Sequence, residues 1–371
     1  MAGLKMTNMF ATGTEDRHAL RGKRRIFAWS ARRRRILHLF FLLGVAAIAM
    51  PVPAQPTDEA SGPAIEHRQG FPNFLSRLSP AEAALSADAG LEVALGGSAI
   101  AELENHRRLT AALGALAAQR PGTVDAYLLS VALDSDPVFG REAREAARVL
   151  ARRYGGEGRT IVLAGPDGTS DDLPHGSLSA LSIALAGIAE RMDLREDVLL
   201  LFVTAHGQPT GLAYHYGDQG FGGMSPTRLG ALLAELGIEK RMLIVNACFS
   251  GSFVPALGTP MSVVVSASAA DRTSFGCAPA NDWTYFGDAF VNRALRRPQG
   301  LRDAFDEARQ LVGQWEANAE LLPSEPRIAV GMAADSWLDP LEARVPETAM
   351  ARTGRPAAVQ EDQRTGSTDA Q

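Results

Sequence analysis

The chain has 371 residues, of which 46% are hydrophobic and 21% are charged, and its formal net charge is −5. This composition is typical of a soluble globular protein with ample core material, in one large domain or two smaller ones. The charge is uneven: residues 1–54 carry ten Lys and Arg against Glu15 and Asp16, so they hold +8 and residues 55–371 hold −13. An acidic body lacks the clustered Lys and Arg that bind phosphates, so nucleic acid is not expected as a partner.

The basic residues at the start of the chain precede an apolar run. Four arginines at 32–35 are followed by the apolar residues 36–50, and Val52-Pro-Ala54 has the small residues that a signal peptidase accepts. The run is shorter than the roughly 20 apolar residues that span a bilayer. The pattern predicts a cleavable export signal in residues 1–54 and a periplasmic or secreted protein. The alternative is an inner-membrane anchor formed by residues 36–54, which would associate the protein with the membrane.

The predicted elements then follow in chain order. Residues 55–120 predict a linker and a helical N-terminal extension, with helices over 80–94 and 98–118, because Ala, Leu, Glu and Arg are good helix formers. Residues 121–335 form the predicted main domain, in which apolar runs alternate with helical patterns. Its strands are expected at 126–133, 159–164, 198–205, 242–247, 262–267 and 327–332, and its helices at 137–154, 175–192, 226–236, 283–296 and 302–316. The tail, residues 336–371, is rich in Pro, Arg and small polar residues and is predicted to be disordered.

This alternation determines the predicted fold class. Continuous apolar runs such as residues 198–203 indicate strands buried on both faces of a parallel sheet. Strands separated by helices predict βαβ units and an open α/β sheet covered on both sides. In such sheets reactive groups gather beyond the carboxyl ends of the strands, so the residues after each strand are the first candidates for chemistry.

Two of these strands run directly into reactive side chains. An apolar run ends in His206-Gly207, and the next strand along the chain ends in Cys248. One crossover joins the two strands, so we expect both side chains at the same sheet edge. A nearby imidazolium lowers a thiol's pKa and favours the nucleophilic thiolate, and the histidine can protonate the leaving amine. The backbone N–H groups of Gly207 and Cys248 are the expected oxyanion donors.

Each of these residues also has a structural interpretation. A lone Cys at a strand end is commonly a small buried hydrophobe, and a lone His is commonly a hydrogen-bonded structural residue. His175, which opens a helix, and His215, in a Gly-rich loop, are rival partners for the thiol, but neither follows a predicted strand. Cys248 and Cys277 are the only two cysteines, so a single disulfide between them is the alternative to a working thiol.

The same segments resemble a known family. Thr204-Ala-His206-Gly and Asn246-Ala-Cys248-Phe-Ser-Gly-Ser-Phe are similar to the catalytic segments of the legumain-type cysteine peptidases, which include asparaginyl endopeptidases and the catalytic subunit of GPI transamidase. Further blocks at 192–198, 270–277 and 284–288 extend the resemblance over about residues 124–335. It implies a caspase-like α/β fold with a mostly parallel, six-stranded sheet and helices on both faces. It also implies cleavage of a peptide or protein substrate through a Cys248–His206 dyad and a thioester acyl-enzyme, without a cofactor, and makes Cys277 a loop residue.

The resemblance also points to substrate-binding residues. Arg141 matches an arginine, and Asp288 an aspartate, of the pocket in asparagine-specific members. Asn246 stands where those members have an acidic residue, and Ala205 where they have an acidic neighbour of the histidine. A preference for asparagine therefore does not carry over. The structural alternative for Arg141 is a solvated charge on a helix face.

Other function classes lack their motifs. The chain has no Gly-x-Ser-x-Gly elbow of a serine hydrolase, and Gly217-x-x-Gly220-x-Gly222 lacks the Lys-Ser/Thr of a phosphate loop. The seven His and two Cys show no zinc-ligand spacing, so no metal is predicted. The remaining alternatives to a cysteine endopeptidase are an inactive peptidase-fold scaffold in the cell envelope and a transpeptidase or ligase that uses the same dyad.

Overall fold

The computed structural model describes residue 67, residues 70–165 and residues 173–357. The chain divides into two units, residues 1–55 and 56–371, and all described residues lie in the second. The predicted export signal, residues 1–54, lies outside the described residues. Within the described part of the chain, no helix combines the length and the apolar character needed to cross a bilayer.

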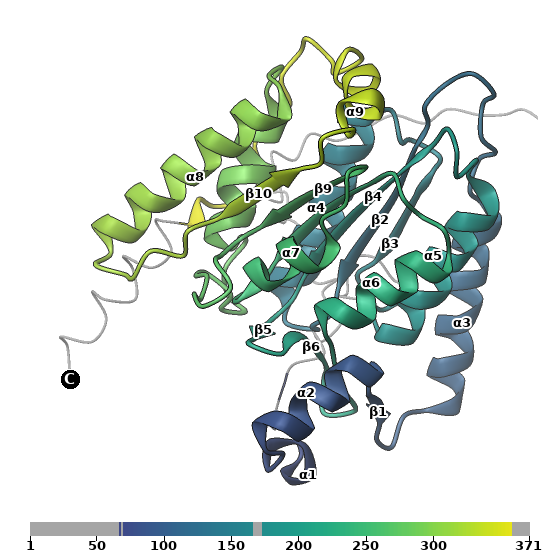
Figure 1. Cartoon of the computed structure of the whole chain (residues 1–371). Helices are drawn as coiled ribbons and strands as arrows, with labels where there is room; N and C mark the ends of the chain where they lie inside the picture. The colour runs from purple at the N-terminus through teal and green to yellow at the C-terminus, as the bar shows by residue number, and fades with distance from the viewer. Residues whose placement is uncertain (1–66, 68–69, 166–172, 358–371) are drawn as a thin grey trace, which may run out of the picture. The chain divides into compact units, whose positions relative to one another are not determined.

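The centre of the described unit is a six-stranded sheet with strand order β10-β9-β8-β4-β2-β3 (Figure 1). Its neighbouring strands are parallel except for β10, which runs antiparallel to β9. All residues of the four central strands are buried, as their continuous apolar sequences predicted. The strands are β2 (Ala126–Ala132), β3 (Thr160–Leu163), β4 (Val198–Thr204), β8 (Arg241–Asn246), β9 (Ser262–Ser266) and β10 (Arg327–Val330).

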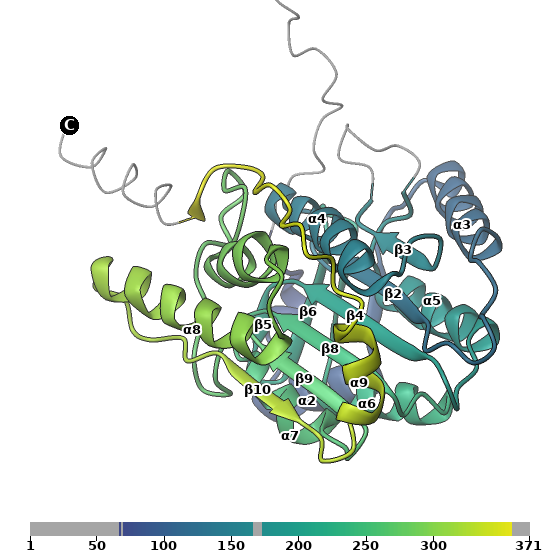
Figure 2. The same ribbon diagram turned by 90° about the horizontal axis from the view of Figure 1, so that it is seen from above.

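Helices cover both faces of this sheet (Figure 2). Successive residues of β4 alternate between the two cores: Leu200 and Phe202 join one, and Leu199 and Leu201 join the other. The first core is closed by α4 (Pro137–Tyr154), the π-helix η2 (Gly287–Arg293), α8 (Leu301–Asn318) and α9 (Asp335–Glu342), and the second by α3 (Ala99–Gly114), α5 (Leu178–Arg191), α6 (Pro226–Glu235) and α7 (Phe253–Leu257). The predicted α/β class, with a mostly parallel six-stranded sheet between helices, is confirmed.

A second, antiparallel sheet was not predicted. It has the order β1-β7-β6-β5, formed by β1 (Glu92–Ala94), β7 (Gly220–Met224), β6 (Gly211–Tyr216) and β5 (Gly207–Gln208). His215, which we placed in a Gly-rich loop, lies on β6. Glycine disfavours strands, so the sequence pattern gave no strand signal, and pairing with neighbouring strands overrides that preference. Because β1 pairs with β7 and α3 contacts α5, residues 80–114 pack onto the main domain rather than forming a separate extension.

The C-terminal boundary also needs correction. Residues 336–357, which we predicted to be disordered, are folded: α9 buries Trp337 and Leu341, and Ala357 is fully buried beyond it. The indole Nε1 of Trp283 donates a hydrogen bond to the carbonyl of Thr353 at 2.8 Å. Polar composition misled the prediction because a few apolar side chains at helical spacing suffice to anchor a segment. Residues 358–371 lie outside the described residues.

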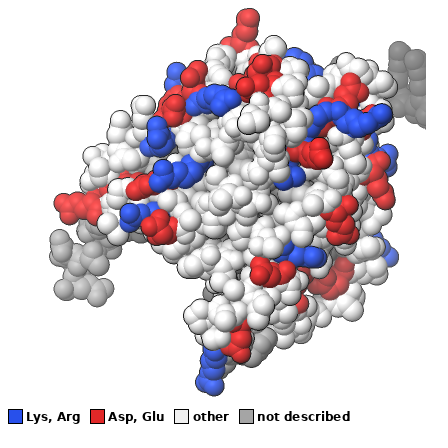
Figure 3. Space-filling view, viewed as in Figure 1, with Lys and Arg blue, Asp and Glu red and all other residues white. Residues whose placement is uncertain are grey.

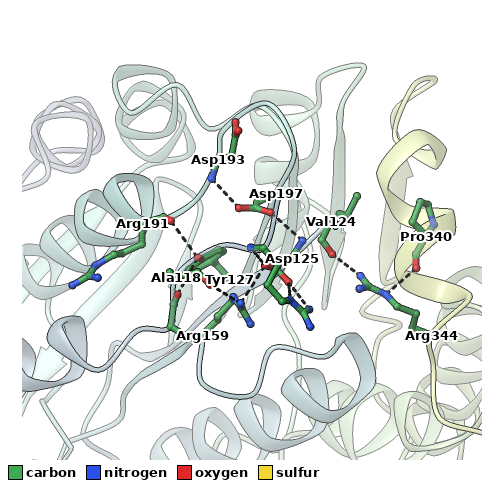
Figure 4. Close-up of polar contacts among 12 residues, drawn as sticks. Ala118, Val124, Asp125, Tyr127, Arg159, Arg191, Asp193, Asp197, Pro340 and Arg344 are labelled. Atoms are coloured by element: carbon green, nitrogen blue, oxygen red, sulfur yellow. Dashed lines mark hydrogen bonds and ion pairs between the residues drawn. The ribbon is translucent and has the colours of Figure 1, made fainter. Parts of the chain in front are cut away.

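The amino ends of β2 and β4 are joined by a buried polar network (Figure 4). The Asp197 carboxylate accepts the backbone N–H of Asp125 at 3.0 Å and that of Asp193 at 2.8 Å. Burial raises the pKa of Asp197, and the two backbone donors oppose that effect. The Asp125 carboxylate in turn pairs with Arg159 at 3.2 Å. The network holds β2 and β4 in register at one end, which aligns their opposite, carboxyl ends.

Charges of both signs are interspersed on the surface. On the face shown in Figure 3, Lys and Arg side chains of the described residues lie among Asp and Glu side chains, with uncharged surface between them. Among the described residues, Arg302 forms an ion pair with Asp335 at 3.0 Å, and Arg309 forms one with Asp306 at 3.2 Å. This mixture differs from the basic stripe that typically binds phosphates. That nucleic acid is not a partner stays a prediction.

The anchoring of residues 336–357 can be tested with Trp337→Ala. Removal of the buried indole should lower the free energy of unfolding in urea by about 3–5 kcal/mol. Met332→Ala is the control, because Met332 is 91% exposed and its loss should change stability by less than about 0.5 kcal/mol. Equal stability of the two variants would contradict the docking of this segment.

Candidate active site

His206 and Cys248 follow neighbouring parallel strands at the same register. Thr204 of β4 pairs with Asn246 of β8, and each candidate side chain lies two residues further on. The Ala205 amide donates to the Asn246 carbonyl at 3.3 Å, which extends the pairing by one residue. The structure therefore brings the two residues to one edge of the sheet, where the His206 side chain is 41% exposed and Cys248 is half-buried.

Gly207 lies directly against the backbone of Cys248. A Cβ at position 207 would meet the Cys248 carbonyl oxygen at 1.9 Å and its nitrogen at 3.0 Å, so only glycine allows the two loops to approach this closely. Among the described residues, none accepts a hydrogen bond from the Cys248 amide. This amide is therefore available as a donor for a substrate oxygen, as an oxyanion hole requires.

The chain turns sharply immediately after Cys248. Phe249 has φ 57°, a left-handed conformation that costs a non-glycine residue about 1–3 kcal/mol. Its amide donates to the Arg272 carbonyl at 2.7 Å, which holds the turn against the loop before Ser274. From that loop, the Ser274 amide donates to the Cys248 sulfur at 3.3 Å. The thiol in turn lies 3.5 Å from the Ser274 carbonyl oxygen and can donate to it, so the backbone of Ser274 positions the Cys248 side chain.

The second cysteine differs from the first. Cys277 is not bonded to Cys248, because both cysteines are free. Burial, followed by the nearby Cys248, raises the pKa of the Cys277 thiol to about 11. It therefore stays protonated near neutral pH and is a poor nucleophile. Cys277 lies outside helices and strands, as predicted for a loop residue.

Two carboxylates that we did not predict face the His206 ring. Asp134 follows β2, and Asp136 precedes α4. The Nε2 atom of His206 is 4.0 Å from an Oδ2 atom of each, and the Phe139 ring lies edge-on to the imidazole at 5.0 Å. The rule that polar groups gather beyond parallel strands would have identified Asp134, because it directly follows the buried run of β2.

The other side of Asp134 contacts His67. The Nε2 atom of His67 is 2.7 Å from Asp134 Oδ1, and its Nδ1 donates to the Gly217 carbonyl at 3.2 Å. Burial alone would lower the pKa of His67, but the hydrogen bond and charge of Asp134 outweigh it and raise the pKa. The His67 ring stacks on His215 at 3.5 Å between centroids. Burial, followed by the neighbouring His67, lowers the pKa of His215.

Spacing along the sequence did not reveal that these groups meet. Two sets bring ligand atoms within 4.8 Å of one another: His67, Asp134 and His215, and Asp134, Asp136 and His206. A metal lies in the plane of each imidazole that binds it, whereas the His67 and His215 rings are stacked with only 15° between their planes. The first set therefore fits an ion pair under a stacked ring better than it fits a metal centre.

A buried carboxylate joins the two strand ends beneath the site. Glu142 of α4 is fully buried and accepts hydrogen bonds of 2.7 Å from Thr204 Oγ1, Asn246 Nδ2, and both the amide and the hydroxyl of Thr284. Burial raises the pKa of Glu142, and these four donors oppose that effect. Thr204 and Asn246 each precede a candidate catalytic residue by two positions, so Glu142 sets the spacing of the strand ends.

Two predicted substrate-binding residues point into the interior. Asn246 is buried in the Glu142 cluster, and its side chain already has protein partners there. Asp288 is fully buried, pairs with Arg293 at 3.0 Å and accepts the amide of Ala357 at 3.1 Å. These contacts give both side chains a structural role. Their contact with substrate stays a prediction.

Arg141 holds a loop rather than lying as an isolated surface charge. Its Nη2 donates to the carbonyls of Pro279 and Asn281, and so connects α4 to the segment after Cys277. The sequence allowed two interpretations of Arg141: a residue of the substrate pocket, or a solvated charge on a helix face. The contact with the loop does not distinguish between them, so a role of Arg141 in substrate binding stays a prediction.

Comparison with known protein families identifies a match over the segment that contains His206 and Cys248. Residues 186–332 match the Peptidase C13 family. This match to the legumain family confirms the resemblance found in the sequence, and it supports a cysteine peptidase. The Peptidase C13 match includes His206, Gly207 and Cys248 but not β2 or α4, so Asp134 lies outside it.

Solved structures similar to the chain include two caspases. The structure of caspase-1 from Spodoptera frugiperda has 15% identity and a TM-score of 0.38, over 56% of this chain and 86% of that one. A structure titled pro-sf-caspase-1 has 13% identity and a TM-score of 0.37, over 57% of this chain and 93% of that one. No curated protein matches the chain.

The role of Glu142 can be tested by unfolding in urea. Glu142→Ala should lower the free energy of unfolding by about 3–5 kcal/mol, because it leaves several buried donors unsatisfied. Glu142→Gln should cost less, because one acceptor oxygen remains. The exposed Glu157 offers the control Glu157→Ala, which should stay within about 0.5 kcal/mol of the unmodified protein. Loss of less than about 1 kcal/mol in Glu142→Ala would contradict the role.

Proposed function

We propose that this protein is an exported cysteine endopeptidase that cleaves peptide bonds through a Cys248–His206 dyad and a thioester acyl-enzyme. The observation that carries the proposal is the pairing of β4 with β8, which delivers both side chains to one edge at equal register. The close approach of Gly207 to Cys248 adds support, because it leaves the Cys248 amide beside the sulfur with no described acceptor.

The reaction follows from these positions. His206 takes the proton of the Cys248 thiol, and the thiolate adds to the carbonyl carbon of the scissile peptide bond. The resulting oxyanion is held by the backbone N–H groups of Cys248 and Gly207. As the tetrahedral intermediate collapses, the C–N bond breaks and His206 protonates the departing amine, which leaves a thioester on Cys248. His206 then removes a proton from water, whose oxygen displaces the sulfur and releases the acid.

Export is the part of the proposal that depends on sequence alone. The basic residues 32–35 and the apolar run 36–50 support a cleavable signal and a periplasmic or secreted enzyme. A retained anchor formed by residues 36–54 would instead hold the enzyme at the inner membrane. A transpeptidase or ligase would use the same thioester, with an amine in place of water.

Replacement of the nucleophile tests the dyad directly. Cys248→Ala should reduce cleavage of an internally quenched peptide library by at least about 10³-fold, because the other described thiol, Cys277, stays protonated near neutral pH and is a poor nucleophile. Cys277→Ala should keep most of the activity and should remain a target for iodoacetamide at Cys248. Equal cleavage by Cys248→Ala and the unmodified protein would refute the assignment.

The contact between the two loops makes a second prediction. Gly207→Ala should lower kcat/KM by at least about 10²-fold, since its methyl group would displace the Cys248 carbonyl and with it the oxyanion donors. Gly223→Ala is the matched control on the adjacent hairpin, where the nearest atom to a new Cβ is 3.4 Å away. Peptide cleavage and melting temperature should be measured for both. Full activity in a folded Gly207→Ala protein would exclude this arrangement.

A further inference from the structure

We propose that Asp134 is a positioning residue for His206, that Asp136 assists it, and that His67 holds Asp134 in place. The inference rests on the proposed function, because it assigns a task to the imidazole of the same dyad. It goes beyond the family match, since β2, α4 and residue 67 all lie outside residues 186–332.

The two oxygens of Asp134 have different surroundings. Oδ1 accepts the Asp136 amide at 2.8 Å and lies 2.7 Å from Nε2 of His67. Oδ2 is buried and has no hydrogen-bond donor among the described residues, and it lies 4.0 Å from Nε2 of His206. A buried carboxylate oxygen without a donor is costly. The imidazole of His206 is the group that can supply one.

The position of the two carboxylates determines which ring nitrogen of His206 can accept the proton of the thiol. Both Asp134 and Asp136 face Nε2 of His206, each at 4.0 Å. A hydrogen bond requires a shorter separation, and catalytic hydrogen bonds commonly tighten only when substrate is bound. A proton held on Nε2 by these carboxylates leaves the lone pair on Nδ1, so Nδ1 accepts the proton of Cys248. The pair thus selects the tautomer and stabilises the imidazolium that forms.

The neighbours of His206 along the chain supply no negative charge. His206 lies between Ala205 and Gly207, neither of which is charged. The β2–α4 loop supplies the two carboxylates instead, and α4 is fixed to the same strand ends through Glu142. Because His67 and His206 approach opposite oxygens of Asp134, the carboxylate is shared between two imidazoles. Loss of His67 would leave Oδ1 with only the Asp136 amide as a hydrogen-bond partner among the described residues and would make the position of the carboxylate beside His206 less fixed.

The experiment measures how the fraction of Cys248 present as thiolate depends on pH, and it needs no peptide substrate. In a Cys277→Ala background, the rate of alkylation by iodoacetamide is followed against pH for Asp134→Asn, Asp136→Asn and His67→Ala. His215 interacts electrostatically with both His67 and His206, and it stays unchanged in these variants, as does Asp218, which interacts with His215. Asp306→Asn, on the exposed side of α8, is the control. Peptide cleavage, melting temperature and the effect of a chelator are recorded for each protein.

We expect Asp134→Asn to shift the alkylation profile to higher pH and to lower kcat by about 10- to 100-fold, with KM changed by less than about threefold. Asp136→Asn and His67→Ala should shift it in the same direction by less, and Asp134→Glu should restore part of kcat. An unchanged profile in these folded variants would overturn the proposal, and so would a chelator that abolishes the difference, since that assigns the acids to a metal. If the unmodified protein cleaves no peptide, the proposed function fails, while the alkylation profiles still decide the role of Asp134.

Discussion

The arrangement of the site depends on one buried carboxylate. Glu142 receives donors from the last residues of β4 and β8 and from Thr284, so a single side chain of α4 connects three segments distant in sequence. An ionisable group in such a position is unfavourable unless every oxygen is satisfied, and here four donors satisfy it. If the strand ends separated, the Glu142 carboxylate would lose hydrogen-bond donors, which is unfavourable for a buried charge. That constraint keeps the candidate nucleophile and base at a constant spacing.

The two candidate catalytic residues have different kinds of neighbours. On the side of Cys248, the contacts are made by backbone atoms: Gly207 against the Cys248 carbonyl, and the Ser274 amide toward the sulfur. At His206, the neighbouring groups are the carboxylates of Asp134 and Asp136. Backbone groups supply donors for a developing oxyanion, and carboxylates supply charge for a developing imidazolium.

Much of this could be predicted, and the failures have identifiable physical causes. The helix predicted at 137–154 has those bounds in the structure, because Pro137 fits the first turn and Gly155 adopts the left-handed conformation that ends it. The hairpin of β6 and β7 was missed because its glycines carry no strand signal, and pairing with β1 stabilises it instead. The folded state of residues 336–357 was missed because it depends on contacts with distant segments, such as the hydrogen bond from the Ala357 amide to Asp288.

By itself, the sequence predicted the α/β class, the side-by-side placement of the strands that precede His206 and Cys248, and Gly207 as a neighbour of the site. Apolar runs and their spacing are local properties, so they can be read from the chain without a structure. Only the tertiary structure decided the surroundings of that pair: the inward direction of Asn246 and Asp288, the Glu142 cluster, and the meeting of His67, Asp134 and His206. These depend on side chains that approach from segments far apart in sequence, and no periodicity records such approaches.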